Sequence, residues 1–486
     1  MSPTLRVLIR DTEIPMSTAT PLPSTSAGRH AIVYGGSTAG LSAAGVLSRH
    51  FERVTLVERD RFENAPHPRK GAPQASHVHG LLTRGMNVLC EVFPGFQEDL
   101  KAAGSIFMDM TGDFAWCMGG LWRPRIQSGI YFYSQSRLLL EWVLRQRLHA
   151  LPNVRVLDGR EVTGFLTSAD KARVTGVQLQ APGGGQEESL EAELVVDASG
   201  RGSRTPQWLE ALGYPRVEET HIHVDVVYAS RLFRAPPGFS ADWKMMNIAP
   251  EFPRERQGAV IQQIENGHLL VSIAGWLGTQ PPLDDAGYVE FTRSLSQPHI
   301  HEVLEHAEPL GPINVFRFSH NQRRHYERMP RFPEGLAPVG DAFCSFNPIY
   351  GQGMTTGALQ AQALGGCVRQ GLGGLSQRYR QQVGQLLAVP WSMATSGDLR
   401  FPEVEGKRPP AFGLTSWYGD RFQQLASHDE EALRTFVRVM HMLESPAALF
   451  SPRLILKTLT SRPTAADLER KPEPPFAPAA AREQAA

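Results

Sequence analysis

The chain has 486 residues, of which 41% are hydrophobic, so it can bury a large core and form two or three domains. Its 49 basic residues are balanced by 49 acidic ones with no long block of either sign, which argues against a nucleic-acid partner or an acidic membrane surface. The four cysteines are scattered, without a C-x-x-C pair or a Cys/His metal spacing, so we expect a cytoplasmic protein without a metal site.

Residues 1–28 are rich in Ser, Thr and Pro and lack the apolar core of a signal peptide, which predicts a disordered leader. Met16 is an alternative start. We therefore expect residues 1–27 to be dispensable for the fold.

A glycine-rich turn follows the first apolar strand, 31–34, and leads into a helix of small and aliphatic residues. Gly35 and Gly40 hold the first and third places of a dinucleotide-binding turn, and Ser37 stands at the second. The next strand ends at Glu58, where an acidic residue would bind ribose hydroxyls. Together they predict a βαβ unit that binds a pyrophosphate at a helix N-terminus.

The segment 69–80 is too polar for a strand and predicts a loop that feeds a helix. His77 and His79 lie in this loop, but no further ligands lie nearby, so we do not favour a metal site. Short strand-like pieces follow over 106–133, and an amphipathic helix is expected over 136–145.

Strands at 154–157, 161–165 and 174–179 predict a β-meander, which leads to a buried strand ending at Asp197. From 222 to 276 long alternating strands predict a separate antiparallel sheet, with an Asn-Gly hairpin turn. Helices are expected over 282–308.

The chain then returns to an apolar strand that ends in Gly340-Asp341, with a long helix after Gly353. The uncharged stretch 342–368 is rich in polar residues and glycine, which argues against a membrane span. Beyond Pro463 the composition predicts a disordered tail.

Three widely separated pieces now form one pattern: 35–40 with Glu58, 197–204, and 340–354. This pattern resembles the single-component FAD-dependent monooxygenases of the aromatic-hydroxylase type (2-polyprenyl-6-methoxyphenol hydroxylase-like), over roughly residues 29 to 400. The sub-patterns at 69–79 and 391–400 look closest to the branch that contains polyether epoxidases.

The resemblance implies that the first motif binds the ADP half of FAD, that Arg137 contacts the cofactor and that Asp341 binds the ribityl chain. Asp197 opens a motif that departs from the family's Asp-Gly, which weakens a direct carry-over of its role. His77 and His79 are candidates for hydrogen bonds near the flavin. The cofactor-binding residues implied are Gly35, Ser37, Thr38, Ala39, Gly40, Glu58, Arg59, Arg69, Arg137, Val162, Asp197, Gly340, Asp341, Pro348, Gly351, Gln352, Gly353 and Met354.

The activity implied by the resemblance is that of an oxidoreductase in secondary metabolism. NADPH or NADH reduces FAD, O2 adds at flavin C4a, and the hydroperoxide hydroxylates or epoxidises an apolar, electron-rich small molecule. Such chemistry needs an apolar pocket, which the aromatic stretches at 114–116, 130–133 and 274–276 could line.

Three alternatives stay open. A flavin-dependent halogenase shares the cofactor domain, although its Trp-x-Trp-x-Ile-Pro signature is missing here. A flavin reductase of prenyl or alkene double bonds would consume no O2. A non-catalytic flavin-binding protein would not need the intact motif from Asp341 to Met354.

The expected fold class is α/β, with a Rossmann-like FAD/NAD(P)-binding domain interleaved with an antiparallel substrate domain, followed by C-terminal helices. We expect the FAD-binding domain to be discontinuous, and a homodimer is open. The expected divisions are a leader at 1–28, the FAD-binding domain at 29–75, 131–215 and 311–385, the substrate domain at 76–130 and 216–310, the helical region at 386–462, and the tail at 463–486.

Overall fold

The computed structural model describes residues 26–474, so Met16, most of the expected leader and the end of the expected tail lie outside the described residues. The first strand begins at Gly28, close to the expected start of the fold.

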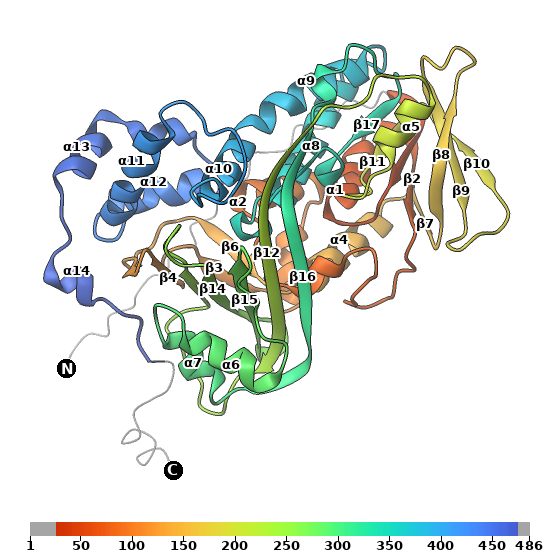
Figure 1. Ribbon diagram of the computed structural model, residues 1–486. Coiled ribbons are helices and arrows are strands. Elements are labelled where there is room, and N and C mark those ends of the chain that lie inside the picture. Colours follow the sequence, from red (N-terminus) through yellow and green to blue (C-terminus); the bar gives the residue numbers. More distant parts are fainter. Residues whose placement is uncertain (1–25, 475–486) are drawn as a thin grey trace, which may run out of the picture.

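A five-stranded parallel sheet forms one half of the molecule (Figure 1), in the order β17-β11-β1-β2-β7. Its central pair β1 and β2 is joined by α1, so the predicted βαβ unit is confirmed. Parallel strands covered on both faces read as continuous apolar runs, as β1 does here. The strands are β1 (Gly28–Tyr34), β2 (Phe51–Glu58), β7 (Val154–Asp158), β11 (Leu194–Asp197) and β17 (Leu336–Pro338).

Helices cover one face of the parallel sheet and a small antiparallel sheet covers the other (Figure 1). The small sheet is the expected meander with one correction, because 154–157 is not part of it but pairs with β2 as β7. The helices are α1 (Thr38–Leu47), α2 (Thr83–Val92), α3 (Phe96–Ala102), α4 (Arg137–His149), α5 (Thr205–Ala211), α8 (Gly353–Val368) and α9 (Leu375–Leu386), and the small sheet is β8 (Glu161–Thr167), β9 (Val174–Gln180) and β10 (Glu188–Glu191).

An eight-stranded sheet forms the second half, in the order β18-β16-β12-β15-β14-β13-β4-β5. It is antiparallel as expected except where β13 runs parallel to β4. The Asn-Gly hairpin between β14 and β15 is confirmed, and Asn266 has a positive φ of 62°. The strands are β4 (Phe114–Met118), β5 (Leu121–Trp122), β12 (Glu219–Arg234), β13 (Met245–Ala249), β14 (Gln257–Ile264), β15 (His268–Trp276), β16 (Glu308–Arg324) and β18 (Cys344–Ser345).

Strand β16 was not predicted, since its polar sequence contains two prolines and a glycine. It runs beside β12 from the far end of the large sheet to the parallel sheet, and Figure 1 shows the pair bridging the two halves. The expected division placed 311–385 in the cofactor domain, whereas residues 308–324 are hydrogen-bonded within the large sheet. A two-stranded sheet, β3 (Ile106–Asp109) with β6 (Tyr131–Ser134), lies nearby.

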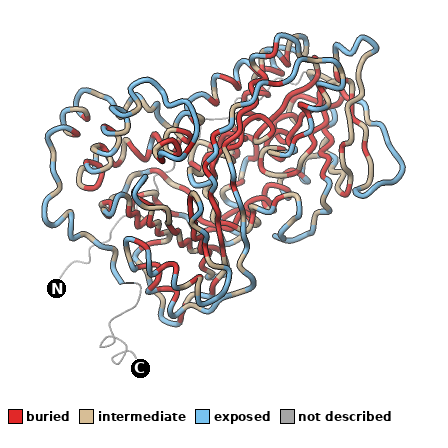
Figure 2. The backbone as a smooth tube through the Cα atoms, in the orientation of Figure 1, coloured by how far each residue is buried: buried red, intermediate tan, exposed pale blue. Residues whose placement is uncertain are grey.

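Two helical groups complete the fold. The expected helices of 282–308 are α6 (Asp285–Arg293) and α7 (His299–Leu304). The C-terminal group comprises α10 (Ala388–Asp398), α11 (Phe412–Leu425), α12 (Glu430–Met440), α13 (Pro452–Thr460) and α14 (Ala465–Glu469). Its helices α11, α12 and α13 pack against β3, β4 and β6 through a shared apolar core (Figures 1 and 2).

The expected disordered tail therefore needs a correction, because α14 lies inside it. Thr464 and Asp467 cap this helix reciprocally, which satisfies amides at its first turn.

Candidate functional site

A cavity of about 670 Å³ runs from the carboxyl ends of the parallel strands to the face of the large sheet and α12. Ligands of open α/β sheets lie at this edge, where loops leave the strands. Most of the predicted site residues line the cavity: Gly35, Ser37, Thr38, Ala39, Glu58, Arg59, Arg69, His77, His79, Arg137, Val162, Gly340, Asp341, Pro348, Gly351, Gly353 and Met354.

The turn into α1 is built for close backbone packing. Gly35 has φ +103°, and a Cβ there would lie 2.2 Å from the carbonyl oxygen of Ala198. Gly40 does not line the cavity; a Cβ on it would lie 1.8 Å from the carbonyl oxygen of Gly35, so its role is to seat the helix on the turn. No side chain of the described residues caps the N-terminus of α1, which leaves amides free for an anion.

Glu58 ends β2 beside this turn. Its carboxylate accepts hydrogen bonds from the amides of Gly36 at 2.6 Å and Asp60 at 2.9 Å, and it lies 3.3 Å from a guanidinium nitrogen of Arg69. Glu58 therefore also organises the turn that it adjoins.

A buried ion cluster that sequence reasoning missed lies behind the turn. Glu141 of α4 accepts hydrogen bonds from Arg69 at 2.8 Å and from Arg137 at 3.0 Å, and the Ser37 hydroxyl donates to it. Burial opposes ionisation, but the two guanidiniums lower the pKa of Glu141 to about 2. The signal in the sequence was the i, i+4 spacing of Arg137 and Glu141 on one helix.

This cluster explains the serine at the second glycine place. Ser37 uses its hydroxyl to accept from Arg137 at 2.9 Å and to donate to Glu141. The glycine turn is thus tied to α4 by a side chain that a glycine could not supply.

Asp341 lies in the 3-10 turn Gly340–Ala342 that follows β17. A Cβ on Gly340 would lie 2.8 Å from Cβ of Ala39, so this turn packs directly on the start of α1. Among residues 26–474 no hydrogen bond to the Asp341 carboxylate is formed; only its backbone carbonyl accepts, from Arg324. Burial raises its pKa, and the charges of Arg137, Arg201 and Arg324 partly oppose that rise.

Asp398 of α10 supports the loop before α8 through hydrogen bonds. The Asp398 carboxylate accepts hydrogen bonds from Asn321 at 2.6 Å, Asn347 at 3.0 Å and the Tyr350 hydroxyl at 2.9 Å. Burial raises the pKa of Asp398 to about 6. This network fixes the loop between Asn347 and Gly351, whose residues Pro348 to Gly351 line the cavity.

The N-terminus of α8 also faces the cavity without a side-chain cap. Gln352, a predicted site residue, does not line the cavity; it is the buried N-cap residue of α8, and its backbone carbonyl accepts from Thr356 at 2.9 Å. Its contribution to the site is to start the helix.

His77 is buried in the lining and tied to the large sheet. Its Nδ1 lies 2.7 Å from the Ser230 hydroxyl, which contacts the Ser272 hydroxyl, and Ser272 accepts from the Val78 amide at 3.1 Å. When the Ser272 hydroxyl donates to Ser230 and the Ser230 hydroxyl donates to His77, Nδ1 accepts and the ring proton lies on Nε2. This Nε2 has no partner among the described residues. Burial lowers the pKa of His77 to about 4.

His79 does not have a donor to spare, which corrects the expectation that it hydrogen-bonds near a flavin. Its Nδ1 lies 2.9 Å from the His77 carbonyl, and its Nε2 lies 3.1 Å from a guanidinium nitrogen of Arg137. The imidazole therefore positions Arg137. Burial and that positive charge lower the pKa of His79 to about 3.

Asp197 is the third predicted site residue outside the lining. Its carboxylate is occupied within its own turn, where it accepts from the amide of Ser199 at 2.9 Å and the hydroxyls of Ser199, Ser203 and Thr205. Asp197 thus shapes the turn whose residues Ala198 to Gly202 do line the cavity.

The far end of the cavity is apolar and comes from three elements that are distant in sequence. The large sheet contributes Phe114, Trp116, Ala274 and Trp276, as the aromatic stretches suggested, and β6 contributes Phe132. Sequence reasoning missed the contribution of α12, where Val437, Met440 and His441 close the wall, because no motif marks them.

Within residues 26–474 no helix combines the length and apolarity needed to cross a bilayer. In the same part of the chain no three His, Cys, Asp or Glu side chains are grouped so that they could hold a metal ion.

A family model for an FAD binding domain matches residues 29–376. The chain is 33% identical over 434 residues to Protein Rv3254 of Mycobacterium tuberculosis. The aligned region covers 86% of this chain and 90% of that protein.

Solved structures share the fold at low sequence identity. PqsL, a probable FAD-dependent monooxygenase from Pseudomonas aeruginosa, aligns with a TM-score of 0.55 at 16% identity, covering 77% of this chain and 97% of its own. The myxobacterial chondrochloren halogenase CndH aligns with a TM-score of 0.55 at 18% identity, covering 91% of this chain and 99% of its own.

Proposed function

The chain belongs to the flavoprotein family defined by this FAD binding domain, the aromatic-hydroxylase type of FAD-dependent oxidoreductase, and we propose that it is an NAD(P)H- and O2-dependent monooxygenase. Its substrate would be an apolar, electron-rich small molecule that it hydroxylates or epoxidises. The observation that carries this proposal is one continuous cavity with polar, cofactor-type groups at one end and an apolar chamber at the other.

The groups at the polar end fit an FAD. The uncapped N-terminus of α1 offers amides to a pyrophosphate, and Glu58 retains acceptor capacity for ribose hydroxyls. The Asp341 carboxylate, without a protein hydrogen-bond partner in the described chain, suits the hydroxyls of a ribityl chain.

The ring end of the cofactor would lie against the loop that Asp398 supports. Amides at the start of α8 would stabilise negative charge on a reduced flavin, because the helix N-terminus carries a partial positive charge. His77 would hold a proton at Nε2 in the same lining. When bound, FAD would accept hydride from NAD(P)H and activate O2.

The protein's own contribution is to place the substrate and exclude water. Among the described residues, the wall of the apolar chamber contains no cysteine and no pair of carboxylates, which suits a reaction whose chemistry belongs to a cofactor. Aromatic walls favour a planar or polyunsaturated substrate.

The test is isotopic. Purified FAD-loaded protein is given NADPH or NADH and 18O2 with a panel of polyenes and phenols, and both O2 uptake and products are measured. We expect one 18O atom in the product and one O2 consumed per NAD(P)H oxidised in the presence of substrate.

Other outcomes would favour the alternatives. A product that gains two hydrogens without O2 uptake would show a prenyl or alkene reductase. Incorporation of chloride or bromide would show a halogenase, and loss of FAD on purification with no rebinding would contradict the proposal altogether.

A further inference from the structure

His441 stands at the carboxyl end of α12, outside the residues that the family model matches, and it is only 1% exposed. It lines the apolar chamber together with Val437 and Met440 of the same helix. The family model therefore does not include it.

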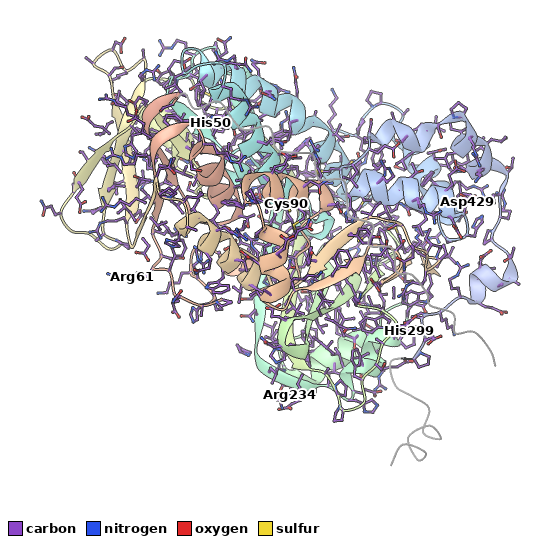
Figure 3. All side chains as sticks on the ribbon, turned by 180° about the vertical axis from the view of Figure 1, so that it is seen from behind. His50, Arg61, Cys90, Arg234, His299 and Asp429 are labelled. Carbon is purple, nitrogen blue, oxygen red and sulfur yellow. The ribbon has the colours of Figure 1, made fainter. Side chains whose placement is uncertain are left out.

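Helix α12 is firmly placed. Asp429, labelled in Figure 3, caps its first turn by accepting from the Ala432 amide at 2.9 Å and pairs with Lys457 of α13 at 2.6 Å. At its other end the His441 carbonyl accepts from the Arg84 amide at 3.3 Å. The imidazole is thus carried on a rigid element.

The Thr83 backbone sets the tautomer of His441. The Thr83 amide, at the start of α2, donates to Nδ1 at 3.2 Å, and the Thr83 hydroxyl lies 2.7 Å from the same nitrogen. The Thr83 hydroxyl also lies 2.9 Å from the Tyr131 carbonyl and has one hydrogen to donate. The amide can only donate, so its hydrogen bond requires an unprotonated Nδ1. We therefore assign the hydroxyl hydrogen to Nδ1 as well, which places the ring proton on Nε2. Burial lowers the pKa of His441 to about 4, so the ring is neutral at pH 7.

This Nε2–H has no hydrogen-bond partner in the described chain. A buried donor without a partner is costly, and in native structures it calls for an explanation. The buried, unpartnered side-chain atoms of the cavity lining are all nitrogens, whereas the described lining holds no such oxygen: His77 Nε2, Trp116 Nε1, Arg201 Nη2, Trp276 Nε1 and His441 Nε2.

A lining that offers donors suits a ligand that brings acceptors. Trp116 is also close to α12, since its ring lies 5.6 Å from that of Phe436. The chamber around His441 is otherwise apolar, so an uncharged acceptor such as a carbonyl oxygen matches it better than a charged one.

We propose that the Nε2–H of His441 donates a hydrogen bond to a conjugated carbonyl oxygen of the substrate, so that α12 selects among the apolar molecules that the cavity admits. This inference rests on the proposed function, because it assigns the apolar chamber to the substrate.

The test compares two probes of the same shape, 2-acetylnaphthalene and 2-isopropenylnaphthalene, in which a C=CH2 replaces the C=O. Binding to the oxidised FAD-loaded enzyme is measured by equilibrium dialysis. We expect the enzyme to prefer the ketone by about 2- to 10-fold, the usual value of one uncharged hydrogen bond. His441→Phe should lose that preference while still binding the alkene.

His299 provides a matched control. It is buried, its Nδ1 also lacks a partner in the described chain, and it lies on α7 outside the cavity (Figure 3). His299→Phe should keep the ketone preference, and so in part should His441→Gln, whose amide can accept from Thr83 and still donate. An unchanged preference in His441→Phe, no preference in the parent enzyme, or no binding of either probe would overturn the proposal.

A second measurement does not depend on any variant folding. Imidazole 15N NMR of the parent enzyme at pH 7 should show His441 as the neutral Nε2–H tautomer, with the Nε2 resonance shifting when 2-acetylnaphthalene is added. A proton on Nδ1 would overturn the proposal. Loss of FAD binding or of 18O incorporation would instead count against the proposed monooxygenase function, so the two failures are distinguishable.

Discussion

Asp341→Asn should weaken FAD binding and at the same time spare or stabilise the apoprotein. The Asp341 side chain is half-buried in the cavity lining and its carboxylate accepts no protein hydrogen bond in the described chain, so its proposed partners are the cofactor's hydroxyls. A hydrogen bond to a charged group contributes about 1.5–3 kcal/mol. At 1.4 kcal/mol per tenfold, we expect FAD affinity to fall by roughly 10- to 150-fold.

The pH dependence of the apoprotein gives the same variant a second signature. Burial raises the pKa of Asp341 above its ordinary 3.8, so the folded apoprotein binds that proton more tightly than the unfolded chain. The stability that this provides is fully present below pH 3.8 and is lost as pH rises through the raised pKa. The variant has no such proton, so its advantage over the parent apoprotein should grow with rising pH.

The assay is a fluorescence titration of apoprotein with FAD, together with thermal unfolding of the apoprotein from below pH 3.8 up to about pH 8. Asp242→Asn is the control, because Asp242 is partly exposed, pairs with Arg125 at 3.5 Å and lies outside the cavity. Unchanged FAD affinity in Asp341→Asn would refute the reasoning. A markedly less stable apoprotein would show that the carboxylate is structural.

Three further changes test the surroundings of the site. Glu141→Gln leaves the buried Arg137 guanidinium without an ion-pair partner in the described chain and leaves Arg69 with Glu58 and Asp60 alone. The pKa drop of Glu141 from 4.5 to about 2 corresponds to about 3 kcal/mol, which urea unfolding should show above pH 4.5 and progressively lose toward pH 2. The raised pKa of Asp398 means that the folded parent binds this proton more tightly than the unfolded chain, so the parent's melting temperature should fall as pH rises from 4 to 6. Asp398→Asn should lose this pH dependence, and identical profiles of melting temperature against pH would contradict the assignment. Glu58→Ala should lower FAD affinity and also destabilise the turn by about 2 kcal/mol, since the Gly36 and Asp60 amides lose their acceptor, and a variant with normal FAD affinity would remove Glu58 from the site.

Local sequence patterns predicted most of the half of the molecule that contains the parallel sheet. An apolar run, a glycine turn and an acidic strand end lie within 30 residues of one another, and each reports a backbone requirement that only certain residues meet. The motif around Asp341 is also local. Its link to the distant glycine turn came from the family resemblance, because a local motif does not show what it packs against.

For other predicted site residues, the surroundings and not the residue type decide the role. Asp197 and His79 were predicted to act toward a cofactor, yet neighbouring hydroxyls occupy Asp197, and Arg137 with the His77 carbonyl occupies His79. The sequence shows that a polar group is present but not which partners have already taken its hydrogen-bonding capacity.

The limit of prediction from the sequence is clearest at the apolar end of the cavity. Strand β16 reads as a polar loop with prolines, but pairing along β12 supplies the hydrogen bonds that make it a strand. Likewise α12 carries no motif, and its position in the cavity wall comes from an apolar core shared with β3, β4 and β6.

By itself the sequence determined the α/β class, the βαβ unit and the family, because these depend on periodicity and on residues close together in the chain. Only the tertiary structure decided that Glu141 is buried between two arginines, and that the Asp341 carboxylate and the Nε2 of His441 have no hydrogen-bond partner among the described residues. Burial and hydrogen-bond partners come from contacts between residues hundreds of positions apart, and the free energy of a polar group depends on those contacts.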